Sequence, residues 1–169
     1  MNYLFLVLSL TLVAMNTANF ATASDAKVNS VSSRMLAHTF RLKPGQDFME
    51  ELTTWAKDHK IKAAAIVSVV GSFTKVNLRY ANQENGSTKE GHFEIVSVVG
   101  TFNATSAHLH ASVSNEKGET FGGHLLPGNI VYTTAEVVVA ELDDVVFSRE
   151  KDDKAKGGSG WDELVIKRK

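Results

Sequence analysis

The sequence predicts a single compact α+β domain in which an antiparallel-rich mixed sheet carries one main helix. Two patterns favour this class: one segment has the apolar spacing of an amphipathic helix, and many shorter stretches have the spacing of strands. No repeat and no linker divides the chain into a second domain. Its 169 residues, 43% hydrophobic and 22% charged, are sufficient for one sizeable core.

The helix is expected after a first strand, Met35–Leu42, and a turn containing proline and glycine. Asp47 is the expected N-cap, and Glu50 follows three residues later as in a capping box. An apolar stripe at helical spacing then consists of Phe48, Leu52, Trp55, Ala56 and His59. We expect the indole of the stripe in the core and its histidine at a capping or surface position.

The remaining apolar stretches are predicted to be strands, separated by polar or glycine-containing turns. The expected strands outside the hairpin described next are 63–70, 75–81, 91–101, 130–142, 145–147 and 164–166. Residues 83–90 are expected to form a polar loop, and residues 150–160 a charged and then glycine-rich connection.

The most informative stretch, residues 107–128, is predicted to form two strands joined by a tight turn. The loop 116–118 suits a three-residue hairpin turn that ends in a glycine with positive φ. Counting back along both strands then places His110 opposite His124, and the period of two places His108 on the same face. A two-residue loop would turn His124 to the other face.

Three neutral imidazoles with a fourth position left to water form an arrangement found in catalytic zinc sites. The sequence therefore predicts His108, His110 and His124 as metal ligands, with Zn²⁺ the expected ion and Ni²⁺ or Cu²⁺ able to compete. The alternative is that these are exposed polar side chains without a ligand. The pair Gly122–Gly123 next to His124 predicts a bulge or the close approach of another backbone or a ligand.

Composition excludes several other classes of function. The chain has no cysteine, which rules out disulfides, thiol catalysis and cysteine-based zinc sites. Its formal net charge of −1 provides no bulk attraction to nucleic acid or to an acidic membrane surface. A phosphate-binding glycine loop, a Gly-x-Ser-x-Gly elbow and a His-Glu-x-x-His motif are all missing from the sequence.

The first residues resemble a secretory signal. A nearly unbroken apolar run over 3–15 is followed by Ala21-Thr22-Ala23, a suitable cleavage site. We therefore expect a signal peptide at 1–23, a polar leader at 24–33, a domain at 34–167 and a secreted or extracytoplasmic mature protein with no membrane span. A buried N-terminal helix is the alternative interpretation of the apolar run.

Several motifs together resemble the plants-and-prokaryotes-conserved (PPC) domain, which also accompanies AT-hooks in plant nuclear-localised proteins. The resembling segments are Leu42-x-Pro44-Gly45-x-Asp47, 63–80, Gly91-x-Phe93-Glu94-Ile95, His108-Leu109-His110, Gly122-Gly123-His124-Leu125 and 136–142. The resemblance covers about residues 34–166 and is closest to the single-domain members without an AT-hook. It implies an α+β domain, a homotrimer and a metal held by the residues that match the three histidines.

An AT-hook needs an Arg-Gly-Arg-Pro core, whereas the two prolines here, Pro44 and Pro127, lie in other contexts. We therefore expect no specific binding of nucleic acid, and DNA binding is the least favoured function.

The favoured function is a secreted metal-binding domain that performs metal-assisted hydrolysis or binds an unknown small molecule. A non-catalytic trimeric binding or assembly module is the alternative. The sequence identifies no catalytic residue, since Glu94, Glu136, Arg79 and His92 qualify by chemical type alone.

Overall fold

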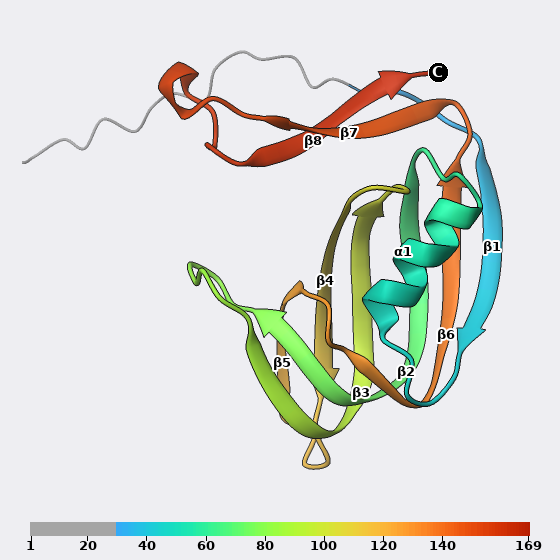
Figure 1. Cartoon of the computed structure of the whole chain (residues 1–169), viewed down its shortest axis with the longest axis vertical. Helices are drawn as coiled ribbons and strands as arrows, with labels where there is room; N and C mark the ends of the chain where they lie inside the picture. Colours follow the sequence, from blue (N-terminus) through green and yellow to red (C-terminus); the bar gives the residue numbers. More distant parts are fainter. Residues whose placement is uncertain (1–29) are drawn as a thin grey trace, which may run out of the picture.

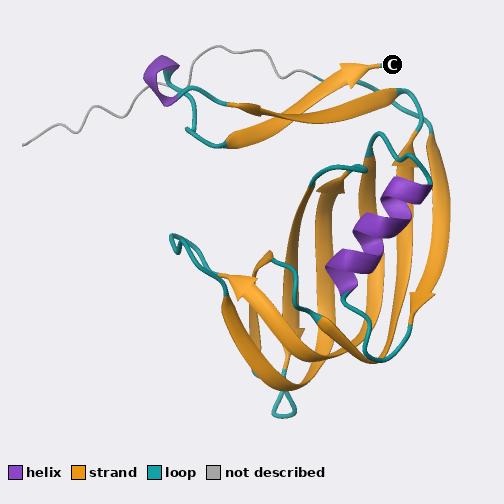
Figure 2. Ribbon diagram, in the orientation of Figure 1, coloured by secondary structure: helices purple, strands orange, loops and turns teal. Residues whose placement is uncertain are grey.

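The structure, a computed structural model, describes residues 30–169. Its elements are β1 Met35–Leu42, α1 Phe48–Asp58, β2 Ala64–Arg79, β3 Ser87–Phe102, β4 Ala107–Ser114, β5 Thr120–Leu125, β6 Ile130–Leu142, β7 Val145–Lys151, the 3₁₀ turn η1 Lys154–Lys156 and β8 Asp162–Arg168. Figure 2 shows one main helix among strands, which confirms the α+β class. The predicted signal peptide, 1–23, and residues 24–29 of the predicted leader lie outside the described residues.

The main sheet has six strands in the order β1-β6-β2-β3-β4-β5, and β7 and β8 form a separate hairpin. A second pairing between β2 and β5 closes β2, β3, β4 and β5 into a ring. Each pairing between the strands just named is antiparallel, a stricter arrangement than the mixed sheet expected from the sequence. Figure 1 shows α1 lying across the sheet and the β7–β8 hairpin set apart at one end of it.

The helix begins where the sequence predicts. The Asp47 carboxylate accepts hydrogen bonds from the backbone N–H groups of Met49 and Glu50, at 2.9 and 3.2 Å, and so caps two unpaired donors. The apolar stripe faces the sheet, with Phe48, Leu52 and Ala56 buried and Trp55 packed against the same core. His59 is the exposed C-cap residue, as expected.

One expectation about β2 is wrong: the two strands predicted within 63–81 are a single strand. Gly71, which follows the first of these two predicted strands, adopts a φ of 146° and lies so near β6 that a Cβ would collide with the backbone oxygen of Thr134. The pairing register with β6 shifts just after this glycine. Glycine therefore allows the strand to bend and to approach its neighbour, and the strand continues beyond it.

The expected polar loop 83–90 is also wrong in part, because β3 already begins at Ser87. Residues 87–90 pair with 75–78 of β2, so polar side chains continue the ladder where one face of the sheet is exposed. The last two strands were located correctly but extend further than their apolar residues, to Lys151 and from Asp162.

The core lies between the helix and the sheet and continues inside the ring of strands. Its largest fully buried side chains include Phe48, Phe73, Leu52, Ile61, Leu78, Leu109 and Leu125. Among residues 30–169, no helix has the length and apolar character needed to cross a bilayer.

Candidate metal centre

The hairpin that carries the three histidines has the predicted register. The backbone N–H of Asn115 donates to the carbonyl of Glu119 at 3.1 Å, and Gly118 has a φ of 78°. His110 of β4 consequently lies directly opposite His124 of β5. The three-residue loop is therefore the local feature that brings these two rings together.

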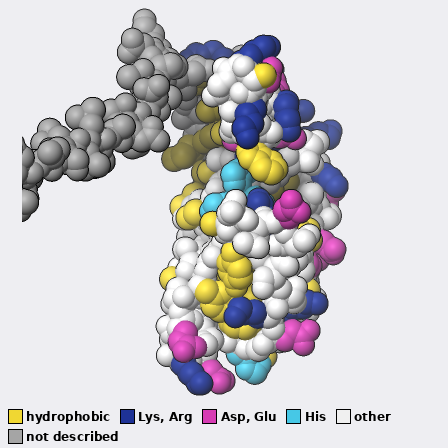
Figure 3. All heavy atoms as spheres, turned by 90° about the vertical axis from the view of Figure 1, so that its left-hand side faces the viewer, with side chains coloured by type: hydrophobic (Ala, Val, Ile, Leu, Met, Phe, Trp, Pro, Cys, Tyr) yellow, Lys and Arg dark blue, Asp and Glu magenta, His cyan; other side chains and the backbone are white. Residues whose placement is uncertain are grey.

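His108, His110 and His124 form one cluster, here called the three-histidine centre. Their ring centroids are 5.0 to 5.5 Å apart, and each ring offers a nitrogen within 4.8 Å of the other two. Figure 3 shows histidine side chains gathered at the surface next to a basic side chain. Within the described part of the chain, this is the group of three or more histidine, aspartate or glutamate side chains whose spacing could hold a metal ion, and all three of its members are histidines.

The centre contains a buried polar atom without a hydrogen-bond partner. Nδ1 of His124 is buried and has no hydrogen-bond partner among residues 30–169. A buried polar atom without a partner is destabilising by about 1–3 kcal/mol, so such atoms are rare. A metal ion bound by three imidazoles would satisfy a nitrogen of this kind, and the residues present therefore fit a metal.

The surroundings of the centre also keep two of its rings, those of His108 and His124, uncharged. Burial, followed by the positive charge of Arg79, lowers the pKa of His124 to about 4. Burial and then the charge of Arg149 lower the pKa of His108. Both rings are neutral at physiological pH, which is the form that binds a metal.

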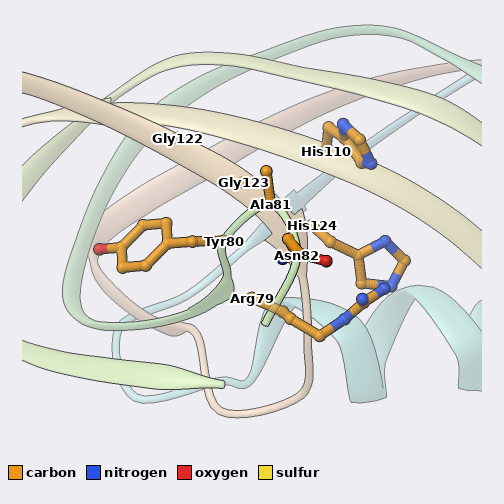
Figure 4. Close-up of a pocket in the computed structure, with 8 residues that line it drawn as sticks. All are labelled: Arg79, Tyr80, Ala81, Asn82, His110, Gly122, Gly123 and His124. Atoms are coloured by element: carbon orange, nitrogen blue, oxygen red, sulfur yellow. The ribbon is translucent and has the colours of Figure 1, made fainter. Parts of the chain in front are cut away.

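Arg79 belongs to the centre because of the strand pairing that closes the ring. It ends β2 and lies opposite His124, so His110, His124 and Arg79 form a row across β4, β5 and β2. Figure 4 shows the Arg79 guanidinium beside the His124 ring, while Tyr80 points away from it. Side chains of directly opposite residues are near neighbours, so Arg79 is positioned to contact a ligand of this centre.

The two glycines before His124 are explained by close packing of strands. A Cβ on Gly122 would lie 2.6 Å from the backbone oxygen of Ala111, and one on Gly123 would lie 2.8 Å from that of Arg79. The predicted close approach of another backbone is therefore confirmed.

Two cavities open onto the three-histidine centre. A smaller one of about 400 Å³ lies against His110 and His124, and its wall also includes Arg79 and Asn82. A larger one of about 1080 Å³ lies against His108 and His124 and extends to the β7–β8 hairpin. The walls of the larger cavity include Arg79, Asn82, Glu84, Arg149, Trp161, Asp162 and Glu163.

Arg149 of β7 contacts the centre directly, with its Nη1 3.3 Å from Nδ1 of His108. A guanidinium can only donate, so Nδ1 accepts this hydrogen bond and the ring proton is on Nε2. A neutral imidazole has one nitrogen lone pair available in its plane. Arg149 therefore occupies the lone pair of His108 that a metal ion would need, and it has to move or be displaced when metal binds.

Of the four residues considered by type alone, only Arg79 lines these cavities. His92 packs on Tyr132 with ring centroids 4.2 Å apart, and Glu94 and Glu136 are exposed on β3 and β6. Sequence reasoning missed Arg149, Trp161 and Glu163. No local pattern identifies them, because the β7–β8 hairpin reaches the histidines only through the three-dimensional fold.

Curated relatives of this chain include the bifunctional protein GlmU of two Synechococcus strains. One is 38% identical over 115 residues, covering 68% of this chain and 18% of the relative, and the other is 37% identical over 131 residues, covering 78% and 20%. The chain thus spans about a fifth of the length of these relatives. AT-hook motif nuclear-localized protein 4 of Arabidopsis thaliana is 29% identical over 121 residues, covering 66% of this chain and 29% of the relative.

Solved structures show the same fold. A hypothetical protein from Salmonella enterica is 38% identical with a TM-score of 0.79, covering 83% of this chain and 99% of that protein. A metal-containing protein from Archaeoglobus fulgidus is 25% identical with a TM-score of 0.66 and the same coverage. A plant- and prokaryote-conserved protein from Pyrococcus horikoshii, 23% identical with a TM-score of 0.62, covers 82% of this chain and 99% of that protein and shows the fold alone.

The Plants and Prokaryotes Conserved domain matches this chain over residues 29–143. The matched stretch includes the three histidines and Arg79, and it ends before Arg149. The motifs, the fold and this match agree with one another. The chain therefore belongs to the Plants and Prokaryotes Conserved domain family, written PCC or PPC.

Proposed function

We propose that this PPC domain binds a divalent transition metal through His108, His110 and His124, with Zn²⁺ the preferred ion. One observation carries the proposal: three imidazoles offer nitrogens within 4.8 Å of one another, and one ring has a buried nitrogen without a partner. The relative from Archaeoglobus fulgidus is described as metal-containing, which supports the same assignment.

An ion held by three imidazoles keeps an open position and, when bound, supplies a Lewis acid. Around it the chain provides two cavities and two guanidinium groups, which suit the binding of a small molecule. Glu163 lies on the wall of the larger cavity and accepts a hydrogen bond from Ser159 at 2.8 Å. Its charge also acts on His108, which makes it the candidate general base on this wall, so both hydrolysis and plain ligand binding are compatible with the site.

Metal analysis tests the proposal. Full-length protein is reconstituted with Zn²⁺, dialysed, and assayed for bound metal per chain, in parallel with His108→Ala, His110→Ala, His124→Ala and the control His59→Ala. We expect about one ion per chain in wild type and in the control. Each ligand variant should lose affinity by more than the roughly 10–100-fold typical of an outer-shell change. Equal zinc in wild type and His124→Ala would disprove the assignment.

A non-catalytic assembly module is the second candidate, and exposed apolar side chains favour it. Val67 and Val70 of β2 and Val96 and Val99 of β3 are 56–61% exposed on neighbouring strands. A patch of this kind is typical of an interaction surface. We propose that it is buried in a homotrimer, and light scattering at micromolar concentration that returns the monomer mass would contradict this.

Export is also a proposal, based on the apolar run and the Ala-Thr-Ala site alone. The intact mass of protein from its native source tests it, since a mass that still includes residues 1–23 would contradict cleavage.

Specific DNA binding is not proposed, and tight sequence-dependent binding in a shift assay at physiological salt would overturn that expectation.

A further inference from the structure

The two arginines beside the three-histidine centre indicate what kind of ligand the centre takes. Arg79 comes from the end of β2 and Arg149 from β7, so two separate parts of the fold bring positive charge to one place. Among residues 30–169, neither guanidinium forms an ion pair with a carboxylate. Their hydrogen bonds go to the carbonyls of Gln83 and Asp162 and to the ring of His108.

The positive charges at the centre are not balanced by a bound negative group when a metal is present. Three neutral imidazoles leave the full charge of a divalent ion uncompensated, and two guanidinium groups nearby repel it. Glu84, Asp162 and Glu163 line the larger cavity, but none of these carboxylates is within ion-pair distance of either arginine. The positive groups therefore lack a negative partner that they could contact together.

We infer that the ligand of this centre is a small molecule with an oxyanion group, a carboxylate or a phosphate, held between the metal and Arg79 and Arg149. This inference rests on the metal-binding function proposed above. A guanidinium donates two parallel hydrogen bonds to either group, which a lysine cannot do. The Asn82 side chain lines both cavities and offers a further amide donor. About 1080 Å³ is enough space for a small organic molecule.

Arg149 has a second role in this inference. Its hydrogen bond occupies the lone pair of His108 that a metal needs, so metal binding releases the guanidinium. The released group remains on the wall of the same cavity, where an oxyanion can pair with it. Metal and oxyanion should consequently bind cooperatively. The metal frees the Arg149 guanidinium for the oxyanion, and the oxyanion compensates the positive charge of the metal and of the freed guanidinium.

Calorimetry on the full chain tests the inference. Wild type and the variants Arg79→Met, Arg149→Met and Arg41→Met are titrated first with Zn²⁺ and then with acetate or methylphosphonate. Arg41 of β1 is a matched control, because it lines neither cavity and donates to Thr134 at 2.9 Å. We expect Arg79→Met and Arg149→Met to weaken oxyanion binding roughly tenfold or more, and the control to leave it unchanged. Arg149→Met should also bind Zn²⁺ more tightly when no oxyanion is present.

The outcomes separate the two proposals, since zinc content is measured on the same samples. Tighter acetate binding would identify a carboxylate ligand and tighter methylphosphonate binding a phosphate ligand, and either result supports the inference. Zinc-loaded wild type that binds neither anion would overturn the inference and leave the metal site intact. Equal anion affinity in wild type, Arg79→Met and Arg149→Met would also overturn it. Loss of zinc from Arg79→Met would count against the inference. The weaker anion binding of that variant would then be explained by the missing metal and not by the missing guanidinium.

Discussion

Two regions of the domain bring histidines together, and they differ in what the ring nitrogens contact. In the first, here called the Trp55 cluster, His38 and His59 pack around the indole of Trp55 with centroids 5.1 and 4.8 Å from it. Nε2 of His38 is hydrogen-bonded to the Glu141 carboxylate at 2.9 Å, and Nδ1 of His59 is hydrogen-bonded to the Trp55 carbonyl at 2.8 Å. In the second, the three-histidine centre, a buried nitrogen of His124 has no partner within the described residues.

The difference shows that the partners of a histidine decide its role more than the number of neighbouring histidines does. The Trp55 cluster has a carboxylate and an aromatic ring, which make it a packed structural element. The three-histidine centre has two arginines and open cavities. It is therefore incomplete as protein alone, which is the property expected of a binding site.

The largest expected difference between the regions is the effect of zinc on stability. Free Zn²⁺ at about 1,000 times its Kd should raise the free energy of unfolding of wild type by about 4 kcal/mol. His108→Ala/His124→Ala should lose this gain, whereas His38→Ala/His59→Ala should keep it despite a lower starting stability. Denaturant titrations with and without zinc measure both values. Loss of the gain in the second variant would show that the Trp55 cluster also affects zinc binding.

Removal of the indole should be the largest effect within the Trp55 cluster. Trp55 stacks on Phe40 and His59 and is only partly buried. We expect Trp55→Ala to cost about 2–3 kcal/mol, less than the roughly 3–5 kcal/mol of a fully buried aromatic residue. Urea unfolding measures the loss, and zinc content should not change. A Trp55→Ala protein that folds but no longer binds zinc would mean that the two regions are coupled.

Acid should lower the folding stability of the metal-free protein, because His124 of the three-histidine centre binds a proton less readily in the folded chain than in the unfolded chain. The pKa of His124 is about 4 in the folded chain against an ordinary value of 6.5. Between these pH values the unfolded chain binds a proton that the folded chain does not, so stability falls as pH falls through this range. Solvent exposure of the ring reduces the expected loss to about 1 kcal/mol. Unfolding free energies measured at neutral pH and near pH 4 should show this loss of stability. His124→Asn should make the unfolding free energy depend less steeply on pH.

The smallest expected effect concerns the hydrogen bond between His38 and Glu141 in the Trp55 cluster. Glu141→Gln keeps the shape of the side chain and removes the charge that faces His38 at 2.9 Å. A pair that is partly open to solvent contributes little, so we expect a loss of about 0.5 kcal/mol. Zinc binding should be unchanged. A loss several times larger would show that this cluster is a functional element after all.

The register of the histidine hairpin could be predicted because local rules determine it. Loop length and the glycine at position 118 set the turn, and the period of two sets which side chains share a face. The N-cap at Asp47 was predictable for the same reason, since capping depends on residues that are close in sequence. Local rules alone therefore predict that His110 lies opposite His124.

Long-range contacts explain what the sequence did not reveal. Gly71 has the same chemistry whether it ends a strand or allows close approach to Thr134, and only the position of β6 distinguishes these cases. Arg79 was one of several charged candidates until the β2–β5 pairing placed it opposite His124. Arg149 gave no signal, because its contact with His108 depends on where the β7–β8 hairpin packs.

All three histidines lie on one hairpin, between positions 108 and 124, and this has a consequence for the order of folding. Hairpins form in about 1–10 μs, whereas pairings between distant segments require slower loop closure. The β4–β5 hairpin can therefore bring His110 opposite His124 before β2 pairs with β5 and before the C-terminal hairpin packs. Arg79 and Arg149 reach the centre only through these long-range contacts, so selection of the proposed oxyanion ligand depends on the finished fold.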